Sequence, residues 1–67
     1  MKFSEKVRKL RIRKGLSQEE LAEKLDVSRQ TVSKWEAGSS LPEIEKLIFL
    51  SDFFQVSIDY LLRDKQI

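Results

Sequence analysis

The 67-residue sequence predicts an all-α fold, a compact bundle of five short helices packed around one core. Apolar residues recur about every 3.6 positions along the whole chain, and no stretch alternates like a strand. The chain has one proline and two glycines, and each stands where a helix is expected to begin or end. A chain of this length forms a single domain, residues 1–67, near the lower size at which one core supports itself.

The first expected helix covers about residues 4–14. Ser4 is its expected N-cap, and Gly15 is expected to end it, because glycine readily takes the left-handed conformation that follows a helix. Its buried face is expected to contain Phe3, Val7 and Leu10.

Residues 17–37 predict a helix-turn-helix. Helices are expected at about 18–25 and 29–37, with Asp26 and Val27 forming the turn. So short a turn makes two helices cross steeply instead of lying antiparallel. The turn requires one left-handed residue, and Asp26 can supply it at a cost of roughly 1 kcal/mol.

Serine residues mark the starts of both helices. Ser17 is followed three positions later by Glu20, which is the spacing of a capping box. Ser28 stands directly before the second helix and can cap it. The apolar residues of the two helices form one set, in which Trp35 is expected to be core: Leu21, Ala22, Leu25, Val27, Val32 and Trp35.

Two more helices are expected, at about residues 42–53 and 58–63. Pro42 suits the first position of a helix, where its missing N–H is not needed, and Ser57 can cap the last helix. The expected core positions of this half are Ile44, Leu47, Ile48, Val56, Leu61 and Leu62, with Ser51 or Phe54 continuing the stripe. Residues 64–67 are expected to form a frayed tail.

The composition excludes several classes of function. Without cysteine there is no disulfide or thiolate metal site, and without histidine the commonest general base and zinc ligand are missing. No catalytic constellation or glycine-rich phosphate loop is visible, so we expect neither an enzyme nor a cofactor. No apolar run approaches the ~20 residues of a membrane span, and the N-terminus does not resemble a signal peptide. A cytoplasmic, nucleoid-associated protein is expected.

The charge is unevenly distributed along the chain, although the net charge is only +2. Residues 1–34 contain ten Lys and Arg against five acids, a balance of +5, and residues 35–67 contain three against six, a balance of −3. A basic half that includes the helix-turn-helix is typical of a protein that binds a polyanion. The alternative is an ordinary solvated surface.

The outer face of the expected helix 29–37 carries side chains suited to reading base edges. An α-helix fits the major groove of DNA, where arginine can pair with guanine and glutamine with adenine. The candidate base-reading residues are Arg29, Gln30, Ser33 and Lys34. Each could also be an ordinary surface residue, but together they share the face of a capped helix held outward by a tight turn.

Helix starts and small polar groups are expected to position the phosphate backbone. The candidate phosphate-positioning residues are Gln18, Ser28, Thr31, Ser39 and Ser40. Simple solvent exposure is the alternative for each. A partly buried ion pair between Arg11 and Glu36 is expected to set the angle between their helices.

Residues 17–38, read as S-Q-E-E-L-A-E-K-L-x-V-S-R-Q-T-V-S-K-W-E-x-G, and residues 54–62, F-x-V-S-I-D-Y-L-L, closely resemble the phage repressor and Cro-like helix-turn-helix family of bacterial transcriptional regulators. The resemblance covers residues 3–63. It implies a lambda-repressor-like five-helix domain that binds operator DNA, usually as a dimer on an inverted repeat; the lambda and 434 repressors are standard examples of such docking.

The resemblance also implies roles for individual residues. Arg29, Gln30 and Lys34 match base-reading positions, Gln18 matches a phosphate contact, and Arg11 with Glu36 matches the interhelical ion pair. Ser28, Thr31 and Ser33 flank the reading positions. Asp26 departs from the pattern, since glycine is frequent there, and the loop at Ser39 and Ser40 lacks the Lys or Arg of some members.

The sequence therefore predicts a sequence-specific double-stranded DNA-binding transcriptional regulator, most simply a repressor. A homodimer is expected through Phe49, Phe53, Ile58 and Tyr60, which exceed what so small a core needs; core filling is the alternative. A second hypothesis is a protein-interaction module of the antitoxin or anti-repressor type that uses the apolar surface of the last two helices. Salt-dependent DNA binding distinguishes the two hypotheses.

Overall fold

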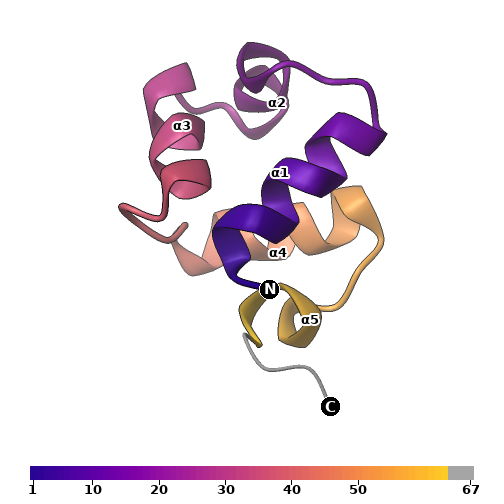
Figure 1. The fold of residues 1–67 in the computed structure, drawn as a ribbon. Helices are drawn as coiled ribbons and strands as arrows, with labels where there is room; N and C mark the ends of the chain where they lie inside the picture. Colours follow the sequence, from indigo (N-terminus) through magenta and orange to yellow (C-terminus); the bar gives the residue numbers. More distant parts are fainter. Residues whose placement is uncertain (64–67) are drawn as a thin grey trace.

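The computed structural model describes residues 1–63, which form five α-helices and no strand (Figure 1). The helices are α1 (Phe3–Arg13), α2 (Gln18–Leu25), α3 (Arg29–Ala37), α4 (Ile44–Phe54) and α5 (Ile58–Leu62). The expected all-α architecture with five helices is therefore confirmed. The tail expected at residues 64–67 lies outside the described residues.

The helices surround a single core (Figure 1). α1 crosses the middle of the molecule, and α2 and α3 pack against each other on one side of it. α4 runs behind α1, and α5 lies at the end away from α2, beside the N-terminus. The helix-turn-helix of α2 and α3 thus packs on a core to which α1 and α4 contribute.

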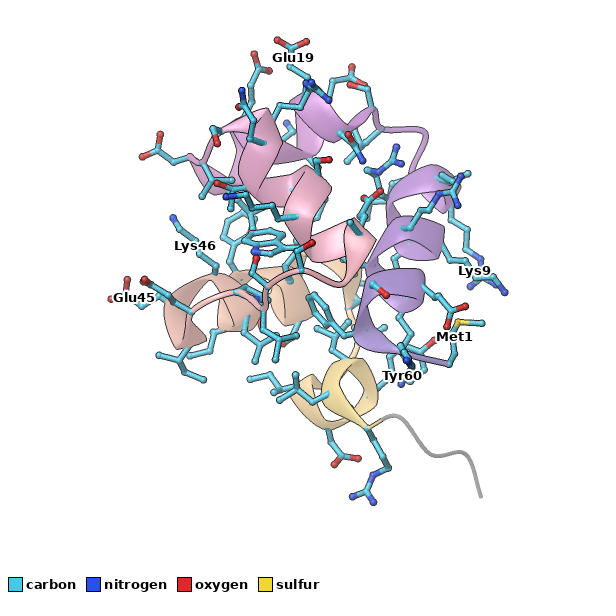
Figure 2. The ribbon with its side chains drawn as sticks, turned by 60° about the vertical axis from the view of Figure 1, so that its left-hand side comes forward. Met1, Lys9, Glu19, Glu45, Lys46 and Tyr60 are labelled. Carbon is cyan, nitrogen blue, oxygen red and sulfur yellow. The ribbon has the colours of Figure 1, made fainter. Side chains whose placement is uncertain are left out.

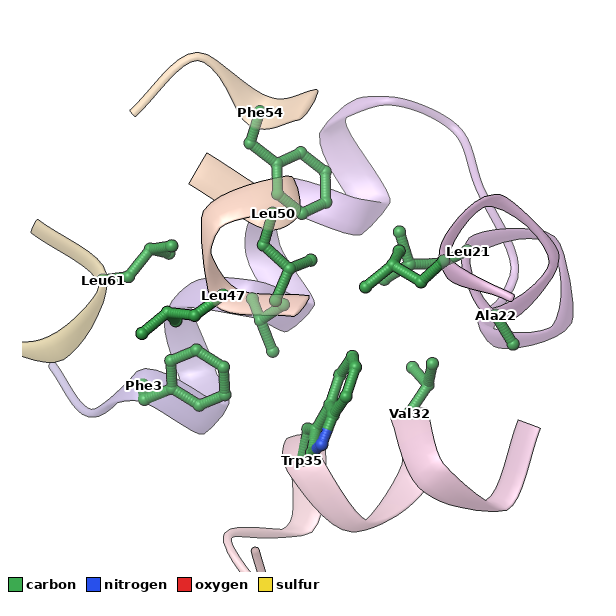
Figure 3. Close-up of a cluster of buried hydrophobic side chains, with 11 residues drawn as sticks. Phe3, Leu21, Ala22, Val32, Trp35, Leu47, Leu50, Phe54 and Leu61 are labelled. Carbon is green, nitrogen blue, oxygen red and sulfur yellow. The ribbon is translucent and has the colours of Figure 1, made fainter. Parts of the chain in front are cut away.

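The core joins residues from every helix (Figure 3). Trp35 is only 2% exposed and points from α3 into the cluster of buried side chains, with Val32 beside it. The buried residues are Phe3, Val7, Leu21, Ala22, Leu25, Val32, Trp35, Leu47, Leu50, Phe54 and Leu61. Burying this apolar surface supplies most of the stability of so small a domain and fixes how α3 is presented.

Lys6 is a buried cation that the sequence pattern did not reveal. Its side chain is on α1 and only 3% of the residue is exposed. The Nζ group donates hydrogen bonds to the backbone carbonyls of Tyr60 and Arg63 and lies 4.7 Å from the centre of the Tyr60 ring. Because a cation suits the carbonyl end of a helix, Lys6 fastens α5 to α1.

Two helices begin elsewhere than the sequence suggested. α1 starts at Phe3 after Lys2, and the Glu5 carboxylate accepts a hydrogen bond from the Lys2 N–H at 3.0 Å, so Ser4 is not the cap. α4 starts at Ile44 after Glu43, and Pro42 belongs to the loop.

The predicted inner face of α4 was wrong in part. Ile44 is 63% exposed and Ile48 46% exposed, whereas Leu50, which was not expected in the core, is fully buried. Since apolar residues surround this helix, their spacing did not determine which side faces inward. Leu62, expected in the core, is 47% exposed.

Two helices end in a left-handed residue that is not glycine. Asp26 has φ 58°, as predicted for the turn between α2 and α3, and Gln55 has φ 56° after α4. Each donates its backbone N–H to carbonyls in the preceding helical turn, which caps the helix. Such φ values cost a side-chain-bearing residue free energy, and the packing on both sides of each turn holds it there.

Candidate nucleic-acid interface

Both helices of the helix-turn-helix begin with a capped turn. Ser17 and Glu20 form the predicted capping box: the Ser17 hydroxyl accepts from the Glu20 N–H at 3.0 Å, and the Glu20 carboxylate accepts from the Ser17 N–H at 2.8 Å. Hydrogen bonding to the carboxyl group from the Ser17 backbone N–H, and next from the Ser17 side chain, lowers the pKa of Glu20, with a smaller contribution from Lys24. Ser28 caps α3 by accepting from the Thr31 N–H at 3.2 Å. The starts of α2 and α3 are therefore well defined.

The outward side of α3 carries the candidate base-reading residues. Arg29, Gln30 and Lys34 are exposed, and Ser33 is half-buried on the side toward α1. The opposite side of α3 is occupied by Val32 and Trp35 in the core. A helix anchored on one side and polar on the other can enter a groove without disturbing the fold.

Shallow hollows flank α3 on both sides. The first, of about 320 Å³, lies between α1, α2 and α3. It is lined by Arg8, Arg11, Gln18, Ser33, Glu36 and Ala37. The second, of about 390 Å³, separates α3 from the loop before α4 and is lined by Val27, Thr31, Lys34, Trp35, Ser40, Leu41, Pro42, Glu43 and Lys46. Polar and cationic groups therefore border α3 on either side.

The predicted ion pair between Arg11 and Glu36 is present. The Arg11 Nε lies 2.6 Å from the Glu36 Oε2, and the side chains are 13% and 5% exposed. Arg11 also donates from Nη1 to the Leu16 carbonyl at 2.7 Å, which fastens the loop between α1 and α2. The pair thus connects α1, that loop and the last turn of α3.

Gln18 extends this network to the surface. Its Nε2 donates to the Glu36 Oε1 at 3.1 Å, and its Oε1 accepts from Arg29 Nη1 at 3.3 Å. Both ends of the Gln18 carboxamide are thus occupied. The first residue of α3 is therefore connected through Gln18 to the buried ion pair.

The other candidate phosphate residues are placed differently from one another. Thr31 is half-buried, and its hydroxyl lies 3.0 Å from the Ser28 hydroxyl, so the two groups are paired. Ser39 and Ser40 are exposed in the loop after α3, and the Ser39 N–H donates to the Lys34 carbonyl at 2.9 Å. The structure brings Gln18 and Ser33 to one flank of α3 and Thr31 and Ser40 to the other.

The sequence pattern missed two cations beside α3. Arg8 of α1 lines the first hollow, and Lys46 of α4 lines the second. Lys46 Nζ also donates to the Leu25 carbonyl at the end of α2, at 2.7 Å. Both positions depend on how distant helices cross, and no local spacing signals that.

Comparison with known proteins agrees with this geometry. A family model described as helix-turn-helix matches residues 7–61, and the chain belongs to this family. The chain is 49% identical over 67 residues to the HTH-type transcriptional activator BcrR of Enterococcus faecalis, covering all of this chain and 33% of BcrR. It is 36% identical over 64 residues to the cryptic phage CTXphi transcriptional repressor RstR of Vibrio cholerae, covering 96% of this chain and 58% of RstR. The chain thus spans less than two thirds of either relative.

Solved structures show the same fold. The P22 c2 repressor protein, crystallised in complex with a synthetic operator, superposes with a TM-score of 0.89 at 32% identity, over 97% of this chain and 98% of that one. A transcriptional regulator from Listeria innocua gives a TM-score of 0.87 at 36% identity, over 98% of this chain and 63% of that one. The lambda-repressor-like fold is therefore confirmed. Among residues 1–63, no helix is long and apolar enough to cross a membrane.

Proposed function

We propose that this chain binds double-stranded DNA in a sequence-specific manner and thereby regulates transcription, as a binding protein and not an enzyme. The observation that carries the proposal is the exposed row Arg29, Gln30 and Lys34 on a helix whose opposite face is buried through Trp35. Such a helix can lie in the major groove with these side chains toward the base edges. The names of the relatives, which include an activator and a repressor, support this role.

Each candidate residue receives a role in this proposal. Arg29, Gln30 and Lys34 read bases, with Ser33 beside them. Gln18, Ser28, Thr31, Ser39 and Ser40 position the backbone on the flanks of α3. Arginine pairing with guanine and glutamine pairing with adenine are the contacts that these side chains make best.

The simplest regulatory consequence is repression, because a domain that occupies promoter DNA excludes other proteins from it. Because the relatives include both an activator and a repressor, a reporter gene placed behind the selected site tests separately whether the chain represses or activates transcription. Such a regulator would act at the bacterial nucleoid.

We further propose that the chain binds as a homodimer through the aromatic surface of α4 and α5. Phe49 is 39% exposed and stacks on Phe53 at 5.8 Å between ring centres, and Tyr60 is 43% exposed. Ile58 and Phe53 are half-buried and would support this surface from below. Two copies related by a two-fold axis would place their α3 helices ~34–36 Å apart, one turn of DNA. An inverted repeat in the selected site, and Phe49→Ser weakening binding to the full site but not to a half-site, would support the dimer.

Selection of bound duplexes from a random pool tests the DNA-binding proposal most directly. We expect one enriched motif, and we expect the association constant to fall with salt at a log–log slope near −0.9 for each phosphate neutralised. The absence of both an enriched motif and salt-dependent binding would contradict the proposal. It would favour the protein-interaction module instead, for which the exposed Ile44, Ile48 and Leu62 supply an apolar surface.

A further inference from the structure

Arg8 lies outside the helix-turn-helix in sequence but beside it in space. It belongs to α1, is exposed, and lines the same hollow of about 320 Å³ as Gln18 and Ser33. Those two neighbours are the residues that the proposed function places against DNA on this flank of α3. The Arg8 guanidinium is therefore within the surface that would face the duplex.

The charge balance of the hollow makes Arg8 distinctive. The other two charged residues of the lining, Arg11 and Glu36, neutralise each other through their ion pair. Within residues 1–63, the Arg8 side chain makes no hydrogen bond and no ion pair. Arg8 is thus the uncompensated cation of a hollow that is otherwise neutral.

A helix seated in the major groove has a phosphate backbone along each side. On one side of α3 the second hollow already offers the cation Lys46, in a lining that also contains Glu43 and the base-reading Lys34. On the other side, the backbone contact assigned to Gln18 is neutral, and the nearby Arg29 is assigned to bases, so Arg8 is the cation left to meet the backbone there. Guanidinium pairs with phosphate through two parallel hydrogen bonds, which suits an arginine at such an edge.

We propose that Arg8 is a phosphate contact that binds the DNA backbone on the α1 side of α3. This inference rests on the proposed function, because it assigns a residue to the same interface. Arg8 contributes affinity and orientation and carries no base preference, as expected of a backbone contact.

Comparison of Arg8→Gln with Lys9→Gln tests the inference. Lys9 is the neighbouring cation on the same helix; it lies at the outer edge of the molecule (Figure 2) and does not line the hollow that Arg8 shares with Gln18 and Ser33. Both substitutions remove one positive charge from an exposed position, so bulk electrostatics are matched. Binding of the selected duplex is measured at several salt concentrations, and thermal unfolding of each variant is followed in parallel.

We expect Arg8→Gln to weaken binding several-fold on specific and non-specific duplexes alike, and to reduce the magnitude of the salt slope by about 0.9. Lys9→Gln should change the slope much less, and Arg8→Lys should retain most of it. Equal slopes for Arg8→Gln and Lys9→Gln would overturn the role of Arg8 while leaving the proposed function intact. An altered base preference in Arg8→Gln would also overturn it. A wild-type chain without salt-dependent DNA binding would overturn the proposed function itself, and Arg8 with it.

Discussion

Arg11 and Glu36 are joined by two hydrogen bonds between α1 and α3, from Nε to Oε2 at 2.6 Å and from Nη2 to Oε1 at 3.1 Å. Because both side chains are almost covered, removing one partner leaves the other charge poorly solvated. We expect Glu36→Leu to lower the free energy of unfolding by roughly 3 kcal/mol, measured by urea denaturation. This loss of unfolding free energy lies near the lower end of the range expected for breaking a buried ion pair, because Arg11 keeps its hydrogen bond to the Leu16 carbonyl.

A matched exposed pair provides the control. Asp59 and Arg63 are bonded at 2.9 Å, but their side chains are 68% and 59% exposed, so Asp59→Asn should leave the urea midpoint unchanged. The double variant Arg11→Met with Glu36→Leu should recover much of the loss. If it is as unstable as the sum of the single variants, the pair does not act as a unit.

The link from Gln18 to Arg29 predicts coupling in DNA binding. Arg29→Ala should cost ~1–3 kcal/mol of binding free energy and relax the preference at one base pair. Gln18→Ala should weaken the same preference in part, because Arg29 loses the acceptor that orients it. In the Arg29→Ala background, Gln18→Ala should have a smaller effect. Additive losses in a double-mutant cycle of binding constants would mean that the two residues act independently.

The buried Lys6 predicts a local effect on α5. Lys6→Met removes the ammonium group that donates hydrogen bonds to the carbonyls of Tyr60 and Arg63, and we expect it to lower the free energy of unfolding by roughly 1–3 kcal/mol. We expect backbone amides of α5 to exchange faster with solvent, while those of α2 and α3 change less. Lys9→Met on the exposed side of α1 is the control and should show no such pattern. Uniform acceleration in all five helices would indicate general destabilisation instead.

The capping box at Ser17 predicts a titration. Hydrogen bonds from the Ser17 backbone and side chain lower the pKa of Glu20 in the folded protein. A lowered folded pKa means that the stabilisation is complete above the ordinary glutamate pKa and is lost as the pH falls through the folded value. Ser17→Ala removes the side-chain hydrogen bond and keeps the backbone N–H, so the Glu20 pKa should move part of the way back toward its ordinary value, observed by NMR titration of the side-chain carboxyl carbon. An unchanged pKa would contradict the assignment of its cause.

The left-handed residues predict a gain of stability. Asp26→Gly and Gln55→Gly should each raise the free energy of unfolding by roughly 0.5–1 kcal/mol, because glycine adopts φ near +60° without strain. Gly38→Ala should act in the opposite direction, since Gly38 has φ 80° although a Cβ there would meet only the Ser4 Oγ at 3.8 Å. Thermal unfolding of the three variants measures these effects. Destabilisation by Asp26→Gly would mean that the aspartate side chain itself contributes to the turn.

Local chemistry explains why α2 and α3 could be predicted to the residue. Ser17, Ser28, Asp26 and Gly38 each mark a helix end by an interaction within a few residues of it. The start of α1 escaped prediction because its cap uses the backbone of Lys2 and the side chain of Glu5, and Ser4 was a more conspicuous candidate.

Features that depend on tertiary structure could not be predicted in this way. The inner side of α4 is set by its packing into the core that all five helices share, so Leu50 is buried and Ile48 is not. Lys6 meets carbonyls that are 54 and 57 residues away along the chain, and Arg8 and Lys46 reach α3 only because α1 and α4 cross near it. The base-reading and phosphate-positioning roles remain predictions that the DNA experiments test.

Trp35 is the single tryptophan of the chain, and it lies on the buried face of α3, the helix proposed to read DNA. Its indole ring is shielded from water between α3 and α4, so its fluorescence emission should shift to longer wavelength when α3 separates from the core. Tyr60, the single tyrosine, is on α5 at a different part of the molecule, where Lys6 lies over its ring. The domain therefore contains two intrinsic optical probes, one for α3 and one for the α1–α5 contact, and loosening of either can be followed without an added label.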